Sequence, residues 1–277
     1  MSKSLFALLL VPLFFTACSP NNVTVDNSLQ RYFDSAGVKG SFGFFDNLHG
    51  HFTIYNLSRY RDSSFSPAGT FDIVQSLIAL QSGVARDERN PAVGSDSMRM
   101  DTVTPQWTAP VMSLTQASRA SPDSANLGFA DLARRIGRDS LKKWIDSLHY
   151  GNRDISGSQD SFWLGGGLKI TPDEQLGLLK KLYFDQLPFF QRSQQLVRQM
   201  FQSEATSNYK LTYKTGRGIK EDGHTIDWIM GWVEENRHPY FFVVNLESAY
   251  PRKDLDAVGL TIAKGILRQL GFFEGKK

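Results

Sequence analysis

Alternating apolar and polar positions predict β-strands near both ends of the chain. Residues 40–56, "GSFGFFDNLHGHFTIYN", form two short β-type runs parted by the turn-rich "DNLHG", which predicts a hairpin. Three more strand-like runs, each bounded by turn residues, follow in the last third: "NYKLTYKTGRG", "TIDWIMGWVEE" and "HPYFFVVNLE". Strands at both ends with helices between them predict an α+β fold, in which an antiparallel sheet is closed by distant segments and a helical region packs against it.

Between the strands, apolar residues recur at helical spacing. "TFDIVQSLIALQSG" (70–83) predicts a buried helix that ends at Gly83, and residues 124–148 predict two helices separated at Gly137. A further helix is predicted in "TPDEQLGLLKKLYF", where Thr171 caps the first turn, and a final amphipathic helix in "DLDAVGLTIAKGILRQLGFF". Residues 84–122 are polar and interrupted by prolines, so we expect an irregular crossing with one short helix around "PVMSLTQAS".

The first residues are typical of an export signal. Lys3 is followed by the apolar run "LFALLLVPLFF" and by "TAC", which ends at Cys18. This predicts a lipoprotein signal over residues 1–17 and a lipidated Cys18, with an ordinary cleaved signal peptide as the alternative; the run is too short for a comfortable transmembrane helix. We expect a polar tether over residues 18–39, a globular domain over 40–277, and a lipid-anchored protein that faces the periplasm. Ser19, rather than an acidic residue, favours the outer membrane.

Composition and charge exclude several other classes. The 277 residues carry a formal net charge of +3 with no extended basic tract, which argues against a nucleic-acid partner. Cys18 is the only cysteine, so no intramolecular disulfide forms. The five histidines are scattered without ligand spacing, so we expect no metal and no cofactor.

Four groups of short strings occur in a definite order. They are "SPAGTFDI" (66–73), "SAN" (124–126), "YGN" (150–152) with "FWL" (162–164), and "KTG" (214–216) with "WIMGW" (228–232). In this order they closely resemble the class D β-lactamases and the related penicillin-sensing and penicillin-binding domains, from about residue 40 to residue 273. The resemblance implies a serine acyl-transfer fold with an antiparallel sheet flanked by helices, a helical subdomain, and a β-lactam or peptidoglycan-derived ligand.

The family's nucleophile motif is S-x-x-K, and this chain departs from it at both chemical positions. Gly69 stands at the serine position and has no atom to acylate, and Asp72 stands at the lysine position, where it is a weak base and forms no carbamate. Thr70 should point about 100° away from the cleft, because an α-helix has 3.6 residues per turn. We do not expect Thr70, Ser66 or Ser76 to replace the missing serine, and Asp72 as a nucleophile ranks lower still.

The second motif is better preserved. The resemblance implies that Ser124 relays protons between the S-x-x-K lysine position and Lys214, whereas spacing alone fits a helix cap before Ala125 equally well. Asn126 departs from the class D valine and resembles the S-x-N of penicillin-binding proteins.

The third motif is expected to bind a ligand carboxylate. Lys214, Thr215 and Gly216 match the strand that lines the cleft, and Arg252 in "YPRKDL" fits the arginine that the family places on the same carboxylate. Taken alone, "KTG" is more typical of an exposed strand end, and Arg252 of surface charge.

The remaining matched residues are expected to be structural. Trp163 matches the tryptophan that holds the family's lysine carbamate, but with Asp72 in place it should be mainly a core residue. Tyr150, Gly151 and Asn152 should form a helix-to-loop turn, and Trp228 and Trp232 should pack the sheet.

Two consequences follow from Gly69 and Asp72. Because an aspartate replaces one of two lysines that the family holds close together, Asp72 and Lys214 should form an ion pair across the cleft floor, through or beside Ser124, within about 6 Å. The favoured function is a lipid-anchored pseudoenzyme that binds a peptidoglycan fragment, a β-lactam or a partner protein. The alternatives are a hydrolase that uses Asp72 as a general base and a purely structural envelope lipoprotein.

Overall fold

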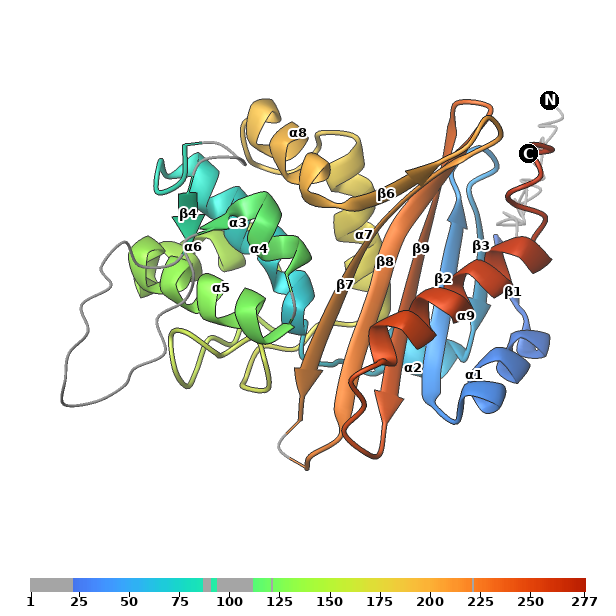
Figure 1. Cartoon of the computed structure of the whole chain (residues 1–277), viewed down its shortest axis with the longest axis horizontal. Coiled ribbons are helices and arrows are strands. Elements are labelled where there is room, and N and C mark those ends of the chain that lie inside the picture. Colours follow the sequence, from blue (N-terminus) through green and yellow to red (C-terminus); the bar gives the residue numbers. More distant parts are fainter. Residues whose placement is uncertain (1–21, 87–90, 94–111, 121, 221) are drawn as a thin grey trace, which may run out of the picture.

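The computed structural model describes residues 22–86, 91–93, 112–120, 122–220 and 222–277. Cys18 and most of the expected crossing at 84–122 lie outside these residues. Within them, one sheet has seven strands in the order β1-β3-β2-β9-β8-β7-β6, and β4 and β5 form a separate pair (Figure 1). The strands are β1 (Val23–Val25), β2 (Lys39–Asp46), β3 (His51–Tyr55), β4 (Pro91–Val93), β5 (Met112–Ser113), β6 (Gln202–Ala205), β7 (Lys210–Ile219), β8 (Thr225–Glu235) and β9 (His238–Ser248).

The predicted antiparallel sheet is confirmed. The hairpin of β2 and β3 forms as expected, and Phe42 of β2 pairs with Val244 of β9, so strands from the two ends of the chain close the sheet. Only the pairing of β1 with β3 is parallel among the described strands.

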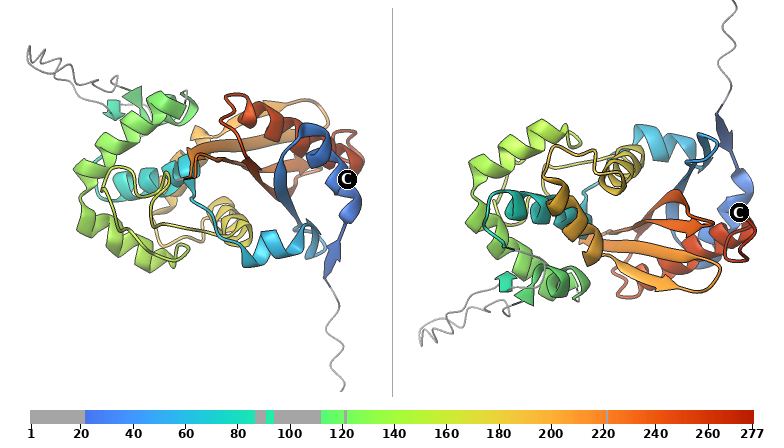
Figure 2. Two further views of the ribbon diagram at one scale, coloured as in Figure 1. Left: turned by 90° about the horizontal axis from the view of Figure 1, so that it is seen from below. Right: turned by 90° about the horizontal axis from the view of Figure 1, so that it is seen from above.

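Helices cover both faces of the sheet and give the mixed α/β class that was expected. They are α1 (Gln30–Ala36), α2 (Leu57–Asp62), α3 (Asp72–Gln81), α4 (Leu114–Arg119), α5 (Pro122–Ile136), α6 (Arg138–Leu148), α7 (Pro172–Tyr183), α8 (Gln191–Met200) and α9 (Leu255–Gln269), with short 3-10 turns η1 (Asn27–Leu29) and η2 (Ala68–Phe71). The two views of Figure 2 show the helical region on one side and α1 and α9 on the other. One apolar core lies on each side, and Trp228 and Ile229 of β8 point into opposite cores.

The helices of the central region follow the sequence pattern. α3 is buried along most of its length, α5 and α6 meet at Gly137 with φ +86°, and Thr171 and Glu174 form a capping box at the start of α7. The short helix expected around "PVMSLTQAS" is α4. α8 has no counterpart in the sequence prediction, because "QRSQQLVRQM" is mostly polar and no side chain caps its first residue.

The expected tether over residues 18–39 is wrong for its described part. Val23–Val25 joins the sheet beside β3, and α1 packs against α9. Leu29 and Phe33 are buried, and the Phe33 ring stacks on Tyr55 at 4.8 Å between centroids. The globular domain therefore includes residues from 22 onward. A three-residue edge strand and a seven-residue helix are too short to give a clear periodic signal.

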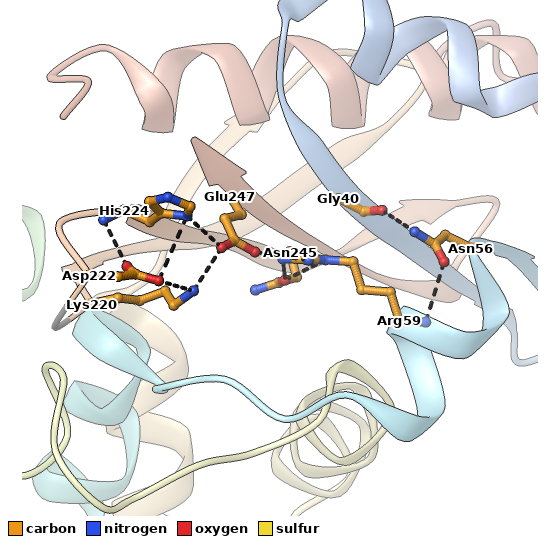
Figure 3. A network of polar contacts seen from close by, with 8 residues as sticks. All are labelled: Gly40, Asn56, Arg59, Lys220, Asp222, His224, Asn245 and Glu247. Carbon is orange, nitrogen blue, oxygen red and sulfur yellow. Dashed lines mark hydrogen bonds and ion pairs between the residues drawn. The ribbon is translucent and has the colours of Figure 1, made fainter. Parts of the chain in front are cut away.

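The turn between β7 and β8 is fixed by a network centred on Glu247 of β9 (Figure 3). The Glu247 carboxylate accepts hydrogen bonds from Lys220 at 2.8 Å and Arg59 at 3.1 Å, and it lies 3.0 Å from the His224 ring. Arg59 also donates to Asn245 at 2.7 Å, which ties α2 to the sheet. Charged residues of α2, of β9 and of the turn between β7 and β8 therefore hold the end of β7 in place.

Candidate functional site

A cleft of about 230 Å³ lies where β7 forms the edge of the sheet. β6 pairs only with Lys210–Tyr213 of β7, so no strand among the described residues pairs with this edge from Lys214 onward. The cleft is lined by residues of the expected motifs, which the fold brings together from distant segments: Gly69, Asp72, Asn126, Lys214, Thr215 and Gly216. The side chain of Ser124 in α5 lies outside the described atoms, so its relay role stays a prediction.

Backbone fills the space beside Gly69. A Cβ atom on Gly69 would lie 3.0 Å from the Cα of Gly216, and one on Gly216 would lie 2.3 Å from the backbone nitrogen of Thr70. η2 and β7 therefore approach each other more closely than two side-chain-bearing residues allow. Ala68 has a left-handed φ of +49°, a conformation that L-residues other than asparagine and aspartate adopt rarely. The backbone is therefore strained at Ala68, directly before the glycine at the expected nucleophile position.

The predicted ion pair between Asp72 and Lys214 is confirmed. Lys214 Nζ lies 3.2 Å from Asp72 Oδ2, and both side chains are at least nine-tenths buried. The same ammonium donates to the carbonyl of Ser118 at 3.0 Å, and Oδ2 has no hydrogen bond beyond the ion pair. Burial raises the pKa of Asp72 to about 6, although the Lys214 charge acts in the opposite direction.

The hydroxyl groups near Gly69 are engaged elsewhere. Thr70 Oγ1 is buried, donates to the carbonyl of Pro67 at 2.6 Å and accepts from Gln175 at 2.8 Å. Ser66 donates to the carbonyl of Trp163, and Ser76 is fully buried in α3. None of these three residues lines the cleft, in agreement with the sequence expectation.

Trp163 is a core residue, as expected. It is fully buried, and its ring lies 5.5 Å from Phe71 and 5.1 Å from Phe162. Among the described residues, its indole N–H has no hydrogen-bond partner.

The other expected structural residues also have structural contacts. A Cβ on Gly151 would lie 2.0 Å from the carbonyl oxygen of Lys169, and Asn152 donates to the carbonyl of Gly167 at 2.8 Å, which fixes the "YGN" turn. Trp228 and Trp232 are buried in the core, and the Trp228 indole donates to the carbonyl of Ser66 at 2.8 Å.

The structure does not bring Arg252 to the cleft. Its guanidinium pairs with Asp254 at 2.9 Å and donates to the carbonyl of Ala36 at 2.9 Å, beside α1. Arg217 lines the cleft instead, two residues beyond Thr215 on the same face of β7. This spacing is the signal that could have identified Arg217 from the sequence.

Two acidic residues belong to the surroundings of the Arg217 strand position. Asp227 of β8 is the strand-register partner of Arg217 and is fully buried, and its Oδ2 has no hydrogen-bond partner among the described residues. Burial raises its pKa to about 7, and the charge of Asp256, which lines the cleft, acts in the same direction. The positive charge of Arg217 is therefore partly offset on one side.

Asp222, His224 and Glu247 place potential metal ligands within 4.8 Å of one another. Lys220 Nζ, however, lies 2.9 Å from Asp222 Oδ2 and 2.8 Å from Glu247 Oε1 (Figure 3). A metal ion would have to displace this ammonium, so the arrangement is that of a salt-bridge network.

Comparisons with known proteins agree with this architecture. The family described as penicillin binding protein transpeptidase domain matches residues 30–270. Beta-lactamase OXA-48 of Klebsiella pneumoniae is 36% identical over 214 residues, which cover 77% of this chain and 77% of that protein. The regulatory protein BlaR1 of Bacillus licheniformis is 29% identical over 245 residues. These residues cover 88% of this chain and 39% of BlaR1.

Solved structures show the same fold. The class D beta-lactamase YbXI from Nostoc matches with a TM-score of 0.76 and 34% identity, over 89% of this chain and 99% of that one. The C-terminal domain of the Bacillus licheniformis BlaR penicillin-receptor matches with a TM-score of 0.76 and 28% identity, over 92% and 98% of the two chains. The chain therefore belongs to the family of penicillin-binding transpeptidase domains and class D β-lactamases.

Proposed function

We propose that this protein is a catalytically inactive member of its family that binds a carboxylate-bearing ligand, either a β-lactam or a peptidoglycan peptide. The observation that carries the proposal is Gly69, whose missing side chain is replaced by close contact with the backbone of Gly216. Loss of a serine nucleophile in a related kind of site lowers turnover by about 10^6-fold.

The ion pair of Asp72 and Lys214 supports inactivity. A general base must accept a proton from the nucleophile or from water. The Asp72 carboxylate instead forms a buried ion pair with the Lys214 ammonium. The alternative of a hydrolase that uses Asp72 to activate water requires water at this carboxylate, whose side chain is only 3% exposed.

The cleft beside the edge of β7 that β6 leaves unpaired supports binding. Thr215 and Arg217 line the cleft, and the hydrogen bonds of the Arg217 guanidinium to described residues go only to the main-chain carbonyls of Arg252 and Lys253. Because Lys214 compensates Asp72, Arg217 is the cation that we assign to the ligand carboxylate. Solved relatives include one whose name is penicillin-receptor, which fits a binding role.

The test uses a fluorescent penicillin in two measurements. Denaturing electrophoresis should show no covalent label, and equilibrium binding should show saturable, reversible association that weakens at high salt. Arg217→Ala should abolish the reversible binding, and the matched control Arg252→Ala should leave it unchanged. A label that survives denaturation contradicts inactivity, and the absence of saturable binding favours the alternative of a structural envelope protein.

We also propose that Cys18 carries a lipid that anchors the domain to the cell envelope, facing the periplasm. The pattern from Lys3 to Cys18 supports this location. No helix among the described residues is long and apolar enough to cross a membrane.

A further inference from the structure

The described fold leaves a very short connection to the proposed lipid. Asn22 is already fixed to the sheet, because its carbonyl accepts a hydrogen bond from the Phe52 N–H at 2.7 Å and its side chain donates to the carbonyl of Gly50 at 3.2 Å. Only residues 19–21 separate Asn22 from Cys18. Because an extended chain spans at most about 3.6 Å per residue, this connection covers no more than about 14 Å. A lipid on Cys18 therefore holds this part of the domain close to the headgroup layer.

The turn between β2 and β3 lies directly beside Asn22 and presents an exposed leucine. Gly50 belongs to this turn, and Leu48 within it is 53% exposed. The Asp46 carboxylate accepts hydrogen bonds from the main-chain N–H groups of Leu48 at 2.9 Å and His49 at 3.1 Å, and it lies 2.7 Å from the His49 ring. The turn is thus fixed by its own side chains, and it holds an apolar group toward the outside.

Two further segments lie at the same end of the sheet (Figure 1). Asp46 of β2 pairs with Tyr240 of β9, so the turn between β8 and β9 lies next to the turn between β2 and β3. The segment after α9 is joined to it, because the Lys277 N–H donates to the Glu235 carboxylate at 3.3 Å. The Asn236 side chain also donates to the Lys277 carbonyl. The turn-tip surface is defined here by residues 47–50, 236–238 and 274–277.

Basic side chains outnumber acidic ones on the turn-tip surface. Arg237, Lys276 and Lys277 are exposed, and Glu274 is the only acidic side chain among its residues. Glu274 pairs with Lys276. The other two cations form no ion pair with a side chain of any described residue, and Lys277 Nζ lies 5.5 Å from the centroid of the Phe272 ring. Two positive charges are therefore available to meet anionic groups beside the exposed leucine.

We infer that the turn-tip surface rests on the phospholipid headgroups of the membrane that holds the lipid of Cys18. In this arrangement Leu48 enters the boundary between headgroups and acyl chains, and Arg237 and Lys277 contact lipid phosphates. A basic patch that acts together with an acyl chain binds a membrane more firmly than either does alone. The inference rests on the proposed lipid anchor and is independent of the ligand proposed for the cleft.

Strand register then sets the height of the cleft above the membrane. Lys214 pairs with Met230, which lies five residues before Glu235 at the end of β8. Gly216 pairs with Trp228, which lies seven residues before Glu235. At about 3.4 Å per residue, the cleft is roughly 17–24 Å from the turn-tip surface. The cleft is thereby held away from the bilayer, where a ligand outside the membrane can reach it.

The experiment measures how close two positions lie to the lipid in the full lipidated chain. Because Cys18 is the only cysteine and its thiol carries the lipid, Leu48→Cys supplies one free thiol for a fluorescent label. Ile219→Cys is the matched control, since Ile219 is 61% exposed and pairs with Thr225 at the opposite end of the sheet. The labelled proteins are reconstituted into vesicles of phosphatidylethanolamine and phosphatidylglycerol that contain a lipid with a spin-labelled, quenching headgroup.

The label on Leu48→Cys should be quenched about fivefold more strongly than the label on Ile219→Cys, because the two positions lie roughly 34 Å apart along the strands. Adding Arg237→Gln and Lys277→Gln to Leu48→Cys should reduce the quenching about twofold or more, since each cation near an anionic surface contributes about 1 kcal/mol. The charge-matched control removes two lysines from α6 by Lys142→Gln and Lys143→Gln, and it should leave the quenching unchanged.

Three results would overturn the inference. Equal quenching at the two positions, or stronger quenching of the Ile219→Cys label, refutes the orientation while the anchor stands. A label on Leu48→Cys that is shielded from iodide in water but is not quenched by the labelled lipid assigns the surface to a protein contact instead. The mass of the purified protein reports the lipid on Cys18 independently. A chain without lipid refutes the anchor together with the inference and leaves the ligand proposed for the cleft unaffected.

Discussion

The ammonium of Lys214 lies 3.2 Å from the carboxylate of Asp72, and both groups are buried at the floor of the cleft. The pair occupies the place where the family resemblance implies two lysines. With an aspartate in place of one lysine, two like charges become an ion pair whose charges compensate each other.

Removal of one partner of the Asp72–Lys214 ion pair should lower the free energy of unfolding. Lys214→Met leaves the Asp72 carboxylate buried without a counter-charge, and we expect unfolding by urea at neutral pH to show a loss of about 3–5 kcal/mol. Asp72→Leu combined with Lys214→Met should recover most of this loss, because no charge then remains buried. The control is Asp146→Asn on α6, which breaks an exposed pair with Lys142 and should cost less than about 0.5 kcal/mol. Equal losses at the two sites would contradict the role of burial.

The dependence of stability on pH should report Asp72. The folded-state pKa of about 6 lies above the ordinary value of 3.8, so the folded protein binds more protons than the unfolded chain between these values. The stability contributed by the protonated group is present below about pH 4 and is lost as the pH rises through 6, by up to about 3 kcal/mol. Denaturation curves for Asp72→Asn should lack this slope. A parallel pH dependence for the variant and the unaltered protein would show that another group is responsible.

Glu247 should produce the opposite slope at lower pH. Burial alone would raise its pKa, but hydrogen bonds from Lys220, His224 and Arg59 outweigh burial and lower it from 4.5 to about 2. Its contribution is present above pH 4.5 and is lost as the pH falls toward 2. With allowance for solvent screening, we expect Glu247→Gln to cost about 1–2 kcal/mol at pH 7, measured by denaturation. Glu274→Gln, which breaks a more exposed pair with Lys276, should have no detectable effect.

A restored nucleophile should react slowly at best. Gly69→Ser alone should take no penicillin label, because it lacks a base. Gly69→Ser with Asp72→Lys should acylate, but only after β7 shifts by a few tenths of an ångström, since the new Cβ lies 3.0 Å from the Cα of Gly216. Gly69→Ala with Asp72→Lys is the control and should remain unlabelled. Rapid labelling of the double variant would contradict the closure of the nucleophile space by backbone.

Lipidation should depend on a single residue. Palmitate supplied to growing cells should label the unaltered protein and should not label Cys18→Ala, because the chain has no other cysteine. Fractionation should then release the variant from the membrane. Continued labelling of Cys18→Ala would disprove the anchor.

The sequence predicted those features that depend on motif order or long periodic runs. The order of the motifs alone predicts that Asp72 and Lys214 form an ion pair. The apolar spacing of residues 70–83 predicts helix α3. Arg252 was assigned to the cleft because an arginine near the end of the last strand fits the family pattern. Its direction depends on Asp254 and Ala36, which sequence spacing does not report.

The pairing of Phe42 with Val244 has a consequence for the order of folding events. About three quarters of the chain lies between these partners, so closing this loop carries an entropic cost and the pairing raises the contact order. β2 and β3 can form their hairpin early, but β2 cannot be covered on its other edge until β9 has been synthesised. We therefore expect the newly made chain to remain open and dependent on its last strand for cooperative collapse, and truncation before β9 to leave the earlier strands without protection from amide hydrogen exchange.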